Sequence, residues 1–250
     1  MTVLSRGGLA TAARDQASPK SGRAGGPPTP LISQLSDELV KHGPRGRFQR
    51  IATRCLDILF ASIGILLASP FMLLAALWVA VDSPGPVLFR QERVGRGGRS
   101  FTMLKFRSMR TDADENVHKE YVQKIYTEGA TTVAAKLHND DRVTKSGKLL
   151  RKTSLDELPQ LFNILGGSMS LVGPRPVLPY EVEVMGPENL DRFAVKPGLT
   201  GPWQVHGRGR TTFLEMMEFD VRYARQATVL TDLGLIVRTP VAVLSGKGAK

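Results

Sequence analysis

The chain has 250 residues, with 34 Lys or Arg and 23 Asp or Glu, and a formal net charge of +11 at pH 7. This length allows one domain with a full core, and the positive charge favours anionic partners such as nucleic acid, acidic lipid or phosphorylated substrates. The single cysteine, Cys55, excludes an internal disulfide, and with four scattered histidines it excludes a Cys/His metal framework.

Residues 1–47 are rich in Gly, Ala, Pro, Ser and Arg and contain few large apolar side chains. Such a composition cannot bury enough apolar surface to fold, so we predict a disordered basic N-terminal tail. A secretory signal needs an apolar core that this tail lacks. Residues 48–250 are expected to form one domain, with a membrane-associated hairpin at about 51–81 and a catalytic part at about 86–250.

Residues 58–81 form a run of 24 residues without a formal charge. As one helix this run would rise about 36 Å, enough to cross a bilayer. Ser69-Pro70 lies at its midpoint, where proline removes a helical hydrogen bond and predicts a sharp kink or reversal. Each half would then be only about 18 Å long, too short to span alone.

Basic residues flank the apolar run on both sides. They are Arg45, Arg47, Arg50 and Arg54 before it and Arg90, Arg93, Arg96 and Arg99 after it. Because basic flanks prefer the cytoplasmic side, a re-entrant hairpin in one leaflet accommodates both groups, and Ser69 is available to bond a carbonyl freed by Pro70. A tilted span and a buried helix pair remain alternatives.

The segment after Pro86 alternates apolar and polar residues on either side of Gly97-Gly98, which predicts a β-hairpin with Phe89 on its apolar face. Its arginines suit either a solvated edge or a diphosphate cradle. We expect Arg93, Arg96 and Arg99 to act through a diffuse field that salt screens. The aromatic residues that single-stranded nucleic acid requires are not interleaved with them, which argues against nucleic acid.

Asp156 and Glu157 form an acidic pair at the start of a predicted short helix, about 157–165. One explanation is simple capping of the helix, with Asp156 as N-cap and Pro159 in the first turn. The alternative is a phosphate site, because helix N-termini bind phosphoryl oxygens. Successive helical residues point about 100° apart, so the two carboxylates would have different roles.

Four further segments complete the prediction. Pro174-Arg175-Pro176 offers either a planar bidentate phosphate contact or an ordinary surface turn. Thr212 and Glu215 form a capping box before an amphipathic helix, and residues 230–244 form an apolar stretch interrupted by Pro240; both suit the core or a membrane interface. Residues 111–137 show weak helical periodicity.

Several motifs occur in an order that resembles the bacterial sugar transferase family, the monotopic phosphoglycosyl transferases. They are Arg54-x-x-Asp57, Ser69-Pro70, KFRSM at 105–109, DDRVTKSGKLLRKTSLDELPQL at 140–161, LVGPRP at 171–176 and KPGLTGPWQVHGR at 196–208. The resemblance covers about four-fifths of the chain, and is to the hexose-phosphate subgroup without its N-terminal transmembrane helices. It implies a mostly α, α+β monotopic membrane protein with a re-entrant helix-break-helix at Ser69-Pro70, interfacial amphipathic helices and a small β-hairpin.

The resemblance also implies a reaction. Asp156 would be the nucleophile that takes a sugar-1-phosphate from a UDP-sugar, releasing UMP, before polyprenyl (undecaprenyl) phosphate accepts it. This would be the first membrane step of exopolysaccharide, capsule, O-antigen or glycoprotein glycan synthesis. Mg²⁺ would be bound near Asp156 and Glu157, and Glu157 would either ligate it or help to deprotonate the acceptor.

Matching family motifs add a set of expected substrate- and phosphate-binding residues. These are Lys105, Arg107, Arg142, Arg151, Arg175 and Gln204. The expected location is the cytoplasmic face of the bacterial inner membrane, with its anionic lipids, and a homodimer is among the assemblies open to the chain. The alternatives are a nucleotidyltransferase acting on a lipid phosphate and a non-enzymatic, membrane-tethered basic module for anionic lipid or nucleic acid.

Overall fold

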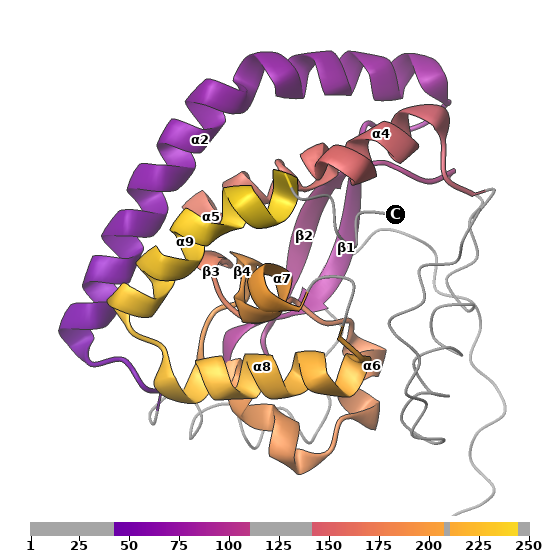
Figure 1. Ribbon diagram of the computed structural model, residues 1–250. Coiled ribbons are helices and arrows are strands. Elements are labelled where there is room, and N and C mark those ends of the chain that lie inside the picture. Colours follow the sequence, from indigo (N-terminus) through magenta and orange to yellow (C-terminus); the bar gives the residue numbers. More distant parts are fainter. Residues whose placement is uncertain (1–42, 111–141, 208–210, 245–250) are drawn as a thin grey trace, which may run out of the picture.

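The computed structural model describes residues 43–110, 142–207 and 211–244. These residues form a mostly helical body with a small two-stranded sheet and a short second pair of strands, as the predicted mostly α, α+β class requires (Figure 1). The helices are α2 (Arg47–Asp82), α4 (Lys145–Thr153), α5 (Gln160–Gly166), α6 (Pro179–Val184), α7 (Pro202–His206), α8 (Phe213–Gln226) and α9 (Val229–Leu244). The strands are β1 (Leu88–Val94), β2 (Ser100–Phe106), β3 (Ser170–Val172) and β4 (Gly198–Thr200), and the 3₁₀ turns are η1 (Arg96–Gly98), η2 (Leu155–Glu157) and η3 (Pro187–Ala194).

Helix α2 is continuous for 36 residues and contains Pro70 within it. Figure 1 shows it rising along one side of the body and bending to run across the top. The Ser69 hydroxyl donates a hydrogen bond to the Leu66 carbonyl over 2.9 Å, and this is the carbonyl that the missing N–H of Pro70 leaves without its usual donor. The disturbance expected at Ser69-Pro70 is therefore a bend within one helix.

The N-terminal half of α2 is attached to the body by two polar side chains. Arg54 donates to the carbonyls of Ile164 and Leu165, each over 2.6 Å, at the C-terminal end of α5, where a cation is favoured. The carboxylate of Asp57 accepts bonds from the Ser170 hydroxyl and the Leu171 N–H over 2.8 and 2.9 Å. This half of the helix is therefore fixed to α5 and β3.

The C-terminal end of α2 is attached to the same body. The Asp82 carboxylate accepts bonds from the backbone N–H and the hydroxyl of Ser146 in α4, over 2.8 and 2.7 Å. Arg107 is buried and donates to the carbonyls of Ser83 and Pro84 just beyond the helix end, over 2.6 and 3.0 Å. Both ends of α2 are thus bound to one globular unit.

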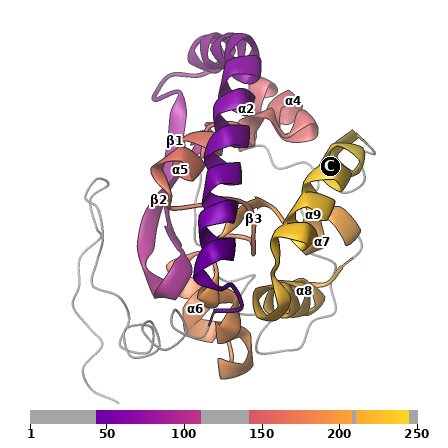
Figure 2. The ribbon, with the colours of Figure 1, turned by 90° about the vertical axis from the view of Figure 1, so that its left-hand side faces the viewer.

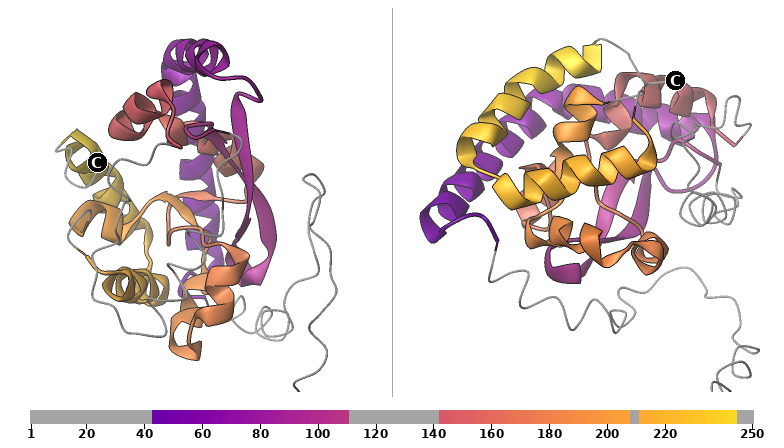
Figure 3. Two further views of the ribbon diagram at one scale, coloured as in Figure 1. Left: turned by 90° about the vertical axis from the view of Figure 1, so that its right-hand side faces the viewer. Right: turned by 60° about the horizontal axis from the view of Figure 1, so that its bottom comes forward.

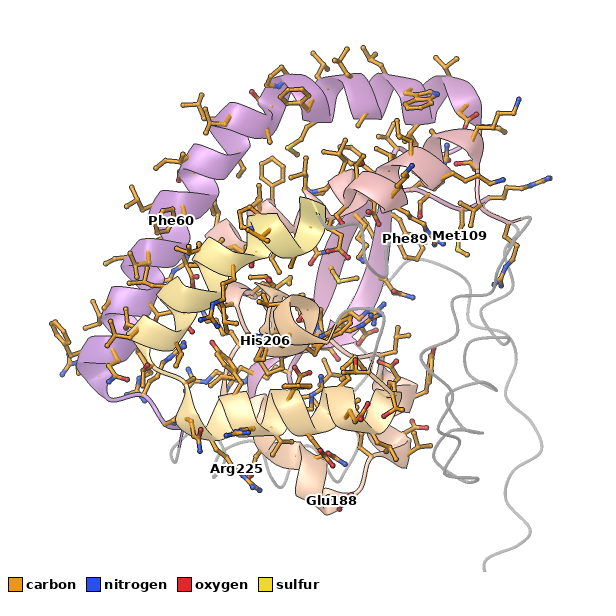
Figure 4. The ribbon with its side chains drawn as sticks, viewed as in Figure 1. Phe60, Phe89, Met109, Glu188, His206 and Arg225 are labelled. Carbon is orange, nitrogen blue, oxygen red and sulfur yellow. The ribbon has the colours of Figure 1, made fainter. Side chains whose placement is uncertain are left out.

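The outer side of α2 is apolar and exposed. Figure 4 shows its side chains projecting away from the body, and Figure 2 views this side directly, with the hairpin on one flank and α9 on the other. The helix is long and apolar enough to cross a membrane by length and composition, yet only 11% of its most apolar window is buried. Exposed members include Leu66, Leu67, Phe71, Leu73, Leu74, Leu77 and Val81. A contiguous apolar surface of this size requires an apolar partner.

The predicted hairpin is present. Strands β1 and β2 are antiparallel, with Leu88 opposite Phe106 and Val94 opposite Ser100. At the turn, Gly97 and Gly98 have φ values of 63° and 70°, a conformation that costs glycine little. Phe89, expected on the apolar face, is 39% exposed. The hairpin packs on the body mainly through Val94, Met103 and Phe106, which are buried.

Strands β3 and β4 bring together two segments that are distant in sequence. They pair in parallel, with Ser170 opposite Gly198 and Val172 opposite Thr200. A Cβ atom at Gly173 would overlap the Lys196 carbonyl oxygen, so glycine is required for this close approach. The pairing places the Pro174–Pro176 loop beside α7.

The start of α8 is as predicted, whereas the interruption expected at Pro240 does not occur. Thr212 accepts a hydrogen bond from the Glu215 N–H, and Glu215 accepts one from the Thr212 N–H, which is the predicted capping box of α8. Helix α9 continues through Pro240. The predicted helical segment at 111–137 and nearly all of the predicted tail lie outside the described residues.

We predict that Gly173→Ala lowers the unfolding free energy by about 1–3 kcal/mol or more, because the added methyl group meets backbone atoms of the β3–β4 pair. Thermal unfolding in detergent micelles measures this. Gly166→Ala is the matched control, since a Cβ at Gly166 meets no atom within 4 Å, and it should be neutral or stabilising by up to about 1 kcal/mol. Equal effects of the two changes would contradict the close approach.

Candidate active site

The acidic pair lies in η2, a separate 3₁₀ turn between α4 and α5. Ser154, with a φ of 59°, ends α4 in the left-handed conformation, and α5 begins only at Gln160, after Pro159. The prediction that the helix starts at about Glu157 is therefore wrong, because α5 starts at Gln160. Neither η2 nor α5 has a side-chain cap, so the capping explanation for Asp156 has no support in this geometry.

The Asp156 carboxyl group is buried, with 8% of the residue exposed. Burial raises its pKa from the ordinary 3.8 to about 6; the charge of Glu157 adds to this rise, while Lys105 and Arg151 oppose it. A carboxylate that is buried but not neutralised costs stability, and such groups concentrate at functional sites.

Glu157 occupies a different environment from its neighbour. The Lys105 ammonium, on β2, lies 3.0 Å from the Glu157 carboxylate, and their side chains are 24% and 39% exposed. Because this pair is partly open to solvent, its effect on stability is small. Its geometric effect is larger, since it joins the hairpin to η2 and holds a cation whose charge also acts on Asp156.

Two further basic residues predicted for the site are Arg151, in α4, and Arg142, which precedes α4. Arg151 in α4 donates to the Ser108 hydroxyl over 2.9 Å and lowers the pKa of Asp156 by its charge. Arg142 is positioned by its backbone, because its carbonyl accepts a bond from the Arg110 N–H over 2.8 Å.

Arg107 has a different surrounding from the one expected. Its guanidinium group is directed at the carbonyls that follow α2, and the residue is 4% exposed. This side chain holds the end of α2, and its hydrogen bonds to those carbonyls are not directed at the acidic pair.

The loop that carries Arg175 is held by a buried ion pair. Arg192 and Asp220 lie 2.6 Å apart and are 2% and 0% exposed. Asp220 accepts a bond from the Arg175 N–H over 3.2 Å, and Arg192 donates to the Arg175 carbonyl over 2.8 Å. The backbone of Arg175 is therefore fixed on both sides.

The side chain of Arg175 is stacked on α7. Its guanidinium carbon lies 5.9 Å from the centre of the Trp203 ring, within the range of a cation–π contact. The next residue, Gln204, has a buried side-chain oxygen without a hydrogen-bond partner among the described residues, and the same holds for the Trp203 indole nitrogen. Buried polar atoms are normally paired, so both are available to a polar ligand.

Arg93 connects the two parts of the site. It is buried, donates to the Pro176 carbonyl over 3.1 Å and to the Gln91 side chain over 2.6 Å. Burial and then the charge of Arg175 lower its pKa to about 10, and Glu157 is among the groups that oppose this. Arg93 is therefore held by fixed contacts in a buried position, and not in the exposed setting that a diffuse, salt-screened field assumes. The sequence pattern does not distinguish Arg93 from Arg96. Arg93 is buried by the Pro176 loop, which is distant in sequence, so its burial depends on the tertiary structure.

These residues could bind a magnesium ion only if the substrate supplied further ligands. No group of three or more His, Cys, Asp or Glu side chains within the described ranges has the arrangement of a metal site. Mg²⁺ is commonly bound through one or two carboxylates together with phosphate oxygens and water. Asp156 and Glu157 supply two carboxylates in adjacent positions.

We predict that Asp156→Asn stabilises the protein above about pH 6 and not below about pH 4. The raised pKa means that the folded state disfavours the charged form of Asp156. When the carboxyl group is ionised, the wild-type protein is therefore destabilised by the burial of that charge. When the group is protonated in both the folded and the unfolded state, this destabilisation is absent. The gain should be on the order of 1–3 kcal/mol at pH 8, measured by denaturant unfolding across this pH range. Asp191→Asn is the control, because Asp191 is a surface carboxylate paired with Arg225. A gain that is absent, or independent of pH, would contradict the burial of an ionised Asp156.

Comparison with known proteins identifies the family of the chain. Residues 48–246 match the family model of the bacterial sugar transferases. Galactosyl transferase CpsE of Streptococcus agalactiae is 43% identical over 201 residues, which is 80% of this chain and 44% of that protein. Exopolysaccharide production protein ExoY of Rhizobium meliloti is 41% identical over 202 residues, covering 80% of this chain and 88% of ExoY.

A third relative is named for its reaction. UDP-glucose:undecaprenyl-phosphate glucose-1-phosphate transferase of Xanthomonas campestris is 42% identical over 213 residues, or 82% of this chain and 41% of that protein. The chain therefore spans less than half the length of CpsE and of the Xanthomonas enzyme, and most of ExoY. The match over residues 48–246 shows that the chain belongs to the bacterial sugar transferase family.

Proposed function

We propose that this protein transfers a sugar-1-phosphate from a UDP-sugar to polyprenyl phosphate and releases UMP. Family membership and the names of relatives that act with undecaprenyl phosphate support the reaction class. The observation that carries the proposal is the carboxyl group of Asp156, which is buried within the field of Lys105 and Arg151 and has a pKa of about 6. Such a group is ionised at neutral pH, weakly solvated and surrounded by cations that suit a diphosphate.

The proposed reaction has two displacements at one phosphorus atom. The Asp156 carboxylate attacks the sugar-bearing phosphorus, the bond from that phosphorus to the bridging oxygen breaks, and UMP leaves with that oxygen. An oxygen of polyprenyl phosphate then attacks the same phosphorus, which releases the Asp156 carboxylate and yields a polyprenyl diphosphate sugar. Covalent catalysis of this kind replaces one difficult step by two easier ones.

The surrounding residues receive distinct proposed roles. Lys105 and Arg151 stabilise negative charge near Asp156, while Arg175, fixed by its loop, offers a planar donor to phosphate oxygens. Gln204 is proposed to bind the sugar or nucleotide through its unpaired side-chain oxygen. Arg142 remains a proposal from the family motif.

Mg²⁺ is proposed as a cofactor held by Asp156 and Glu157. When bound, the ion would neutralise diphosphate oxygens and favour departure of UMP. Glu157 is then shared between the cation and Lys105, which lies 3.0 Å away.

We also propose a membrane position for α2. Because both ends of the helix are bonded to one polar body, a bilayer crossing would require that body to cross as well. A helix that enters one leaflet, bends at Pro70 and returns lets its apolar outer side contact lipid. The basic flanks and the need for UDP-sugar favour the cytoplasmic face of the bacterial inner membrane.

The test uses purified full chain with a panel of UDP-sugars. We predict a phosphosugar adduct on Asp156 with UDP-sugar alone, detected by peptide mass spectrometry, and UMP release that continues only when polyprenyl phosphate is added. Asp156→Asn should form no adduct and lose at least about 10³-fold in turnover, whereas Asp191→Asn should retain activity. Release of pyrophosphate would indicate a nucleotidyltransferase. An adduct on another residue, or an active Asp156→Asn variant, would overturn the proposal.

A further inference from the structure

A cavity lies apart from the acidic pair. It has a volume of about 450 Å³, is open to the surface and is lined by residues of α7, α8 and α9. Helix α7 packs against both α8 and α9, and Figure 3 shows these three helices from two further sides. Pro202, Phe219 and Leu235 supply apolar lining. The lining contains none of the dyad, Lys105, Arg151 or Arg175, so the cavity is separate from the proposed catalytic groups.

The cavity is bordered by two arginines and a histidine and has no acidic lining residue. His206, Arg222 and Arg238 contribute from the three helices, and Figure 4 labels His206 on α7 between α8 and α9. Arg222 and Arg238 are exposed and form no ion pair or hydrogen bond within the described part of the chain. By contrast, Arg225, one turn further along α8, is paired with Asp191 over 2.6 Å.

An apolar surface continues from the cavity along α9. The cavity side of α9 carries Gly234 and Arg238. The adjacent face carries Leu230, Val237 and Val241, which are 79%, 74% and 70% exposed. Residues spaced by seven and eleven share a helix face, so these three form one stripe beside the cations. A ligand with an anionic head and an apolar chain would satisfy both surfaces.

We propose that this cavity binds the phosphate group of an anionic phospholipid, with an acyl chain along the α9 stripe. Two arginines and a histidine around an apolar floor match a phosphate diester joined to hydrocarbon. Because the lining lacks the dyad, the bound phosphate is not a reacting group. The lipid would instead hold α7, in which Trp203 contacts the Arg175 side chain.

The test measures lipid binding to purified full chain in nonionic micelles by native mass spectrometry. Phosphatidylglycerol is titrated, with phosphatidylcholine of the same chains and inorganic phosphate as comparisons. We expect one phosphatidylglycerol to be retained, an affinity loss of about ten-fold for Arg222→Gln or Arg238→Gln, and a larger loss for both together. Arg225→Gln removes the same charge from the same helix and should bind as wild type.

A cavity-filling variant separates a defined site from general surface charge. A Cβ at Gly234 meets no atom within 4 Å, so Gly234→Leu should fold while occupying the cavity without removing a charge. It should lose phosphatidylglycerol binding as the double arginine variant does. Binding is measured without UDP-sugar and in an Asp156→Asn background, so the result does not depend on the proposed transfer reaction.

Several results would overturn the proposal. Unchanged binding in the double variant or in Gly234→Leu would remove the cavity as the site. Equal retention of phosphatidylcholine would show that the phosphate diester alone, without net negative charge, is what binds. Displacement of the lipid by inorganic phosphate at equal concentration would show that the protein does not recognise the acyl chain. Preferential retention of polyprenyl phosphate would assign the cavity to the acceptor instead of a phospholipid.

Discussion

The attachment of both ends of α2 to one polar body is the constraint on which the rest of the structure depends. Arg54 bonds the end of α5, and Asp82 bonds the start of α4. The turn that carries Asp156 lies between these two helices, so the position of the carboxyl group follows from the helix that flanks them both. The outer side of the same helix is apolar and exposed, which requires a lipid-like environment. One element thus determines where the dyad lies and, in the membrane position proposed above, which side of the protein would contact lipid.

Electrostatics at the site follow a trade-off between stability and reactivity. Burial raises the pKa of Asp156 to about 6, and the positive charges of Lys105 and Arg151 limit that rise. In the proposed reaction an incoming diphosphate would lie among these cations, so their charge would serve the bound substrate as well as the carboxylate. Arg93 extends this field to the Arg175 loop, at the cost of its own desolvation, which lowers its pKa to about 10. These groups act as one network, because each shifts the protonation of another.

Local sequence signals predicted most helices, turns and caps correctly. They predicted less well which residues make long-range contacts in the folded protein. Ser69-Pro70, Gly97-Gly98 and Thr212-x-x-Glu215 each carry a backbone requirement, and the bend, the turn and the cap occur at those residues. Asp156 lies in a 3₁₀ turn because Ser154 adopts a left-handed conformation, which the sequence pattern does not indicate. The contrast between Arg93, which is buried and bonded to the Pro176 carbonyl, and Arg107, which holds the end of α2, depends on contacts more than 20 residues apart in sequence. Charge patterning alone cannot distinguish such residues.

The most direct test of this account is the sidedness of the two ends of α2 in intact bacteria. Single cysteines replace Arg47 and Arg90 in a Cys55→Ser background, and a third replaces Leu67 on the apolar outer side. The account predicts that a membrane-impermeant thiol reagent labels neither end in intact cells and both ends in inside-out vesicles, while the cysteine at position 67 reacts only after detergent is added. Labelling of one end from outside the cell and of the other only from inside would show that α2 spans the bilayer, and would contradict attachment of both ends to one body.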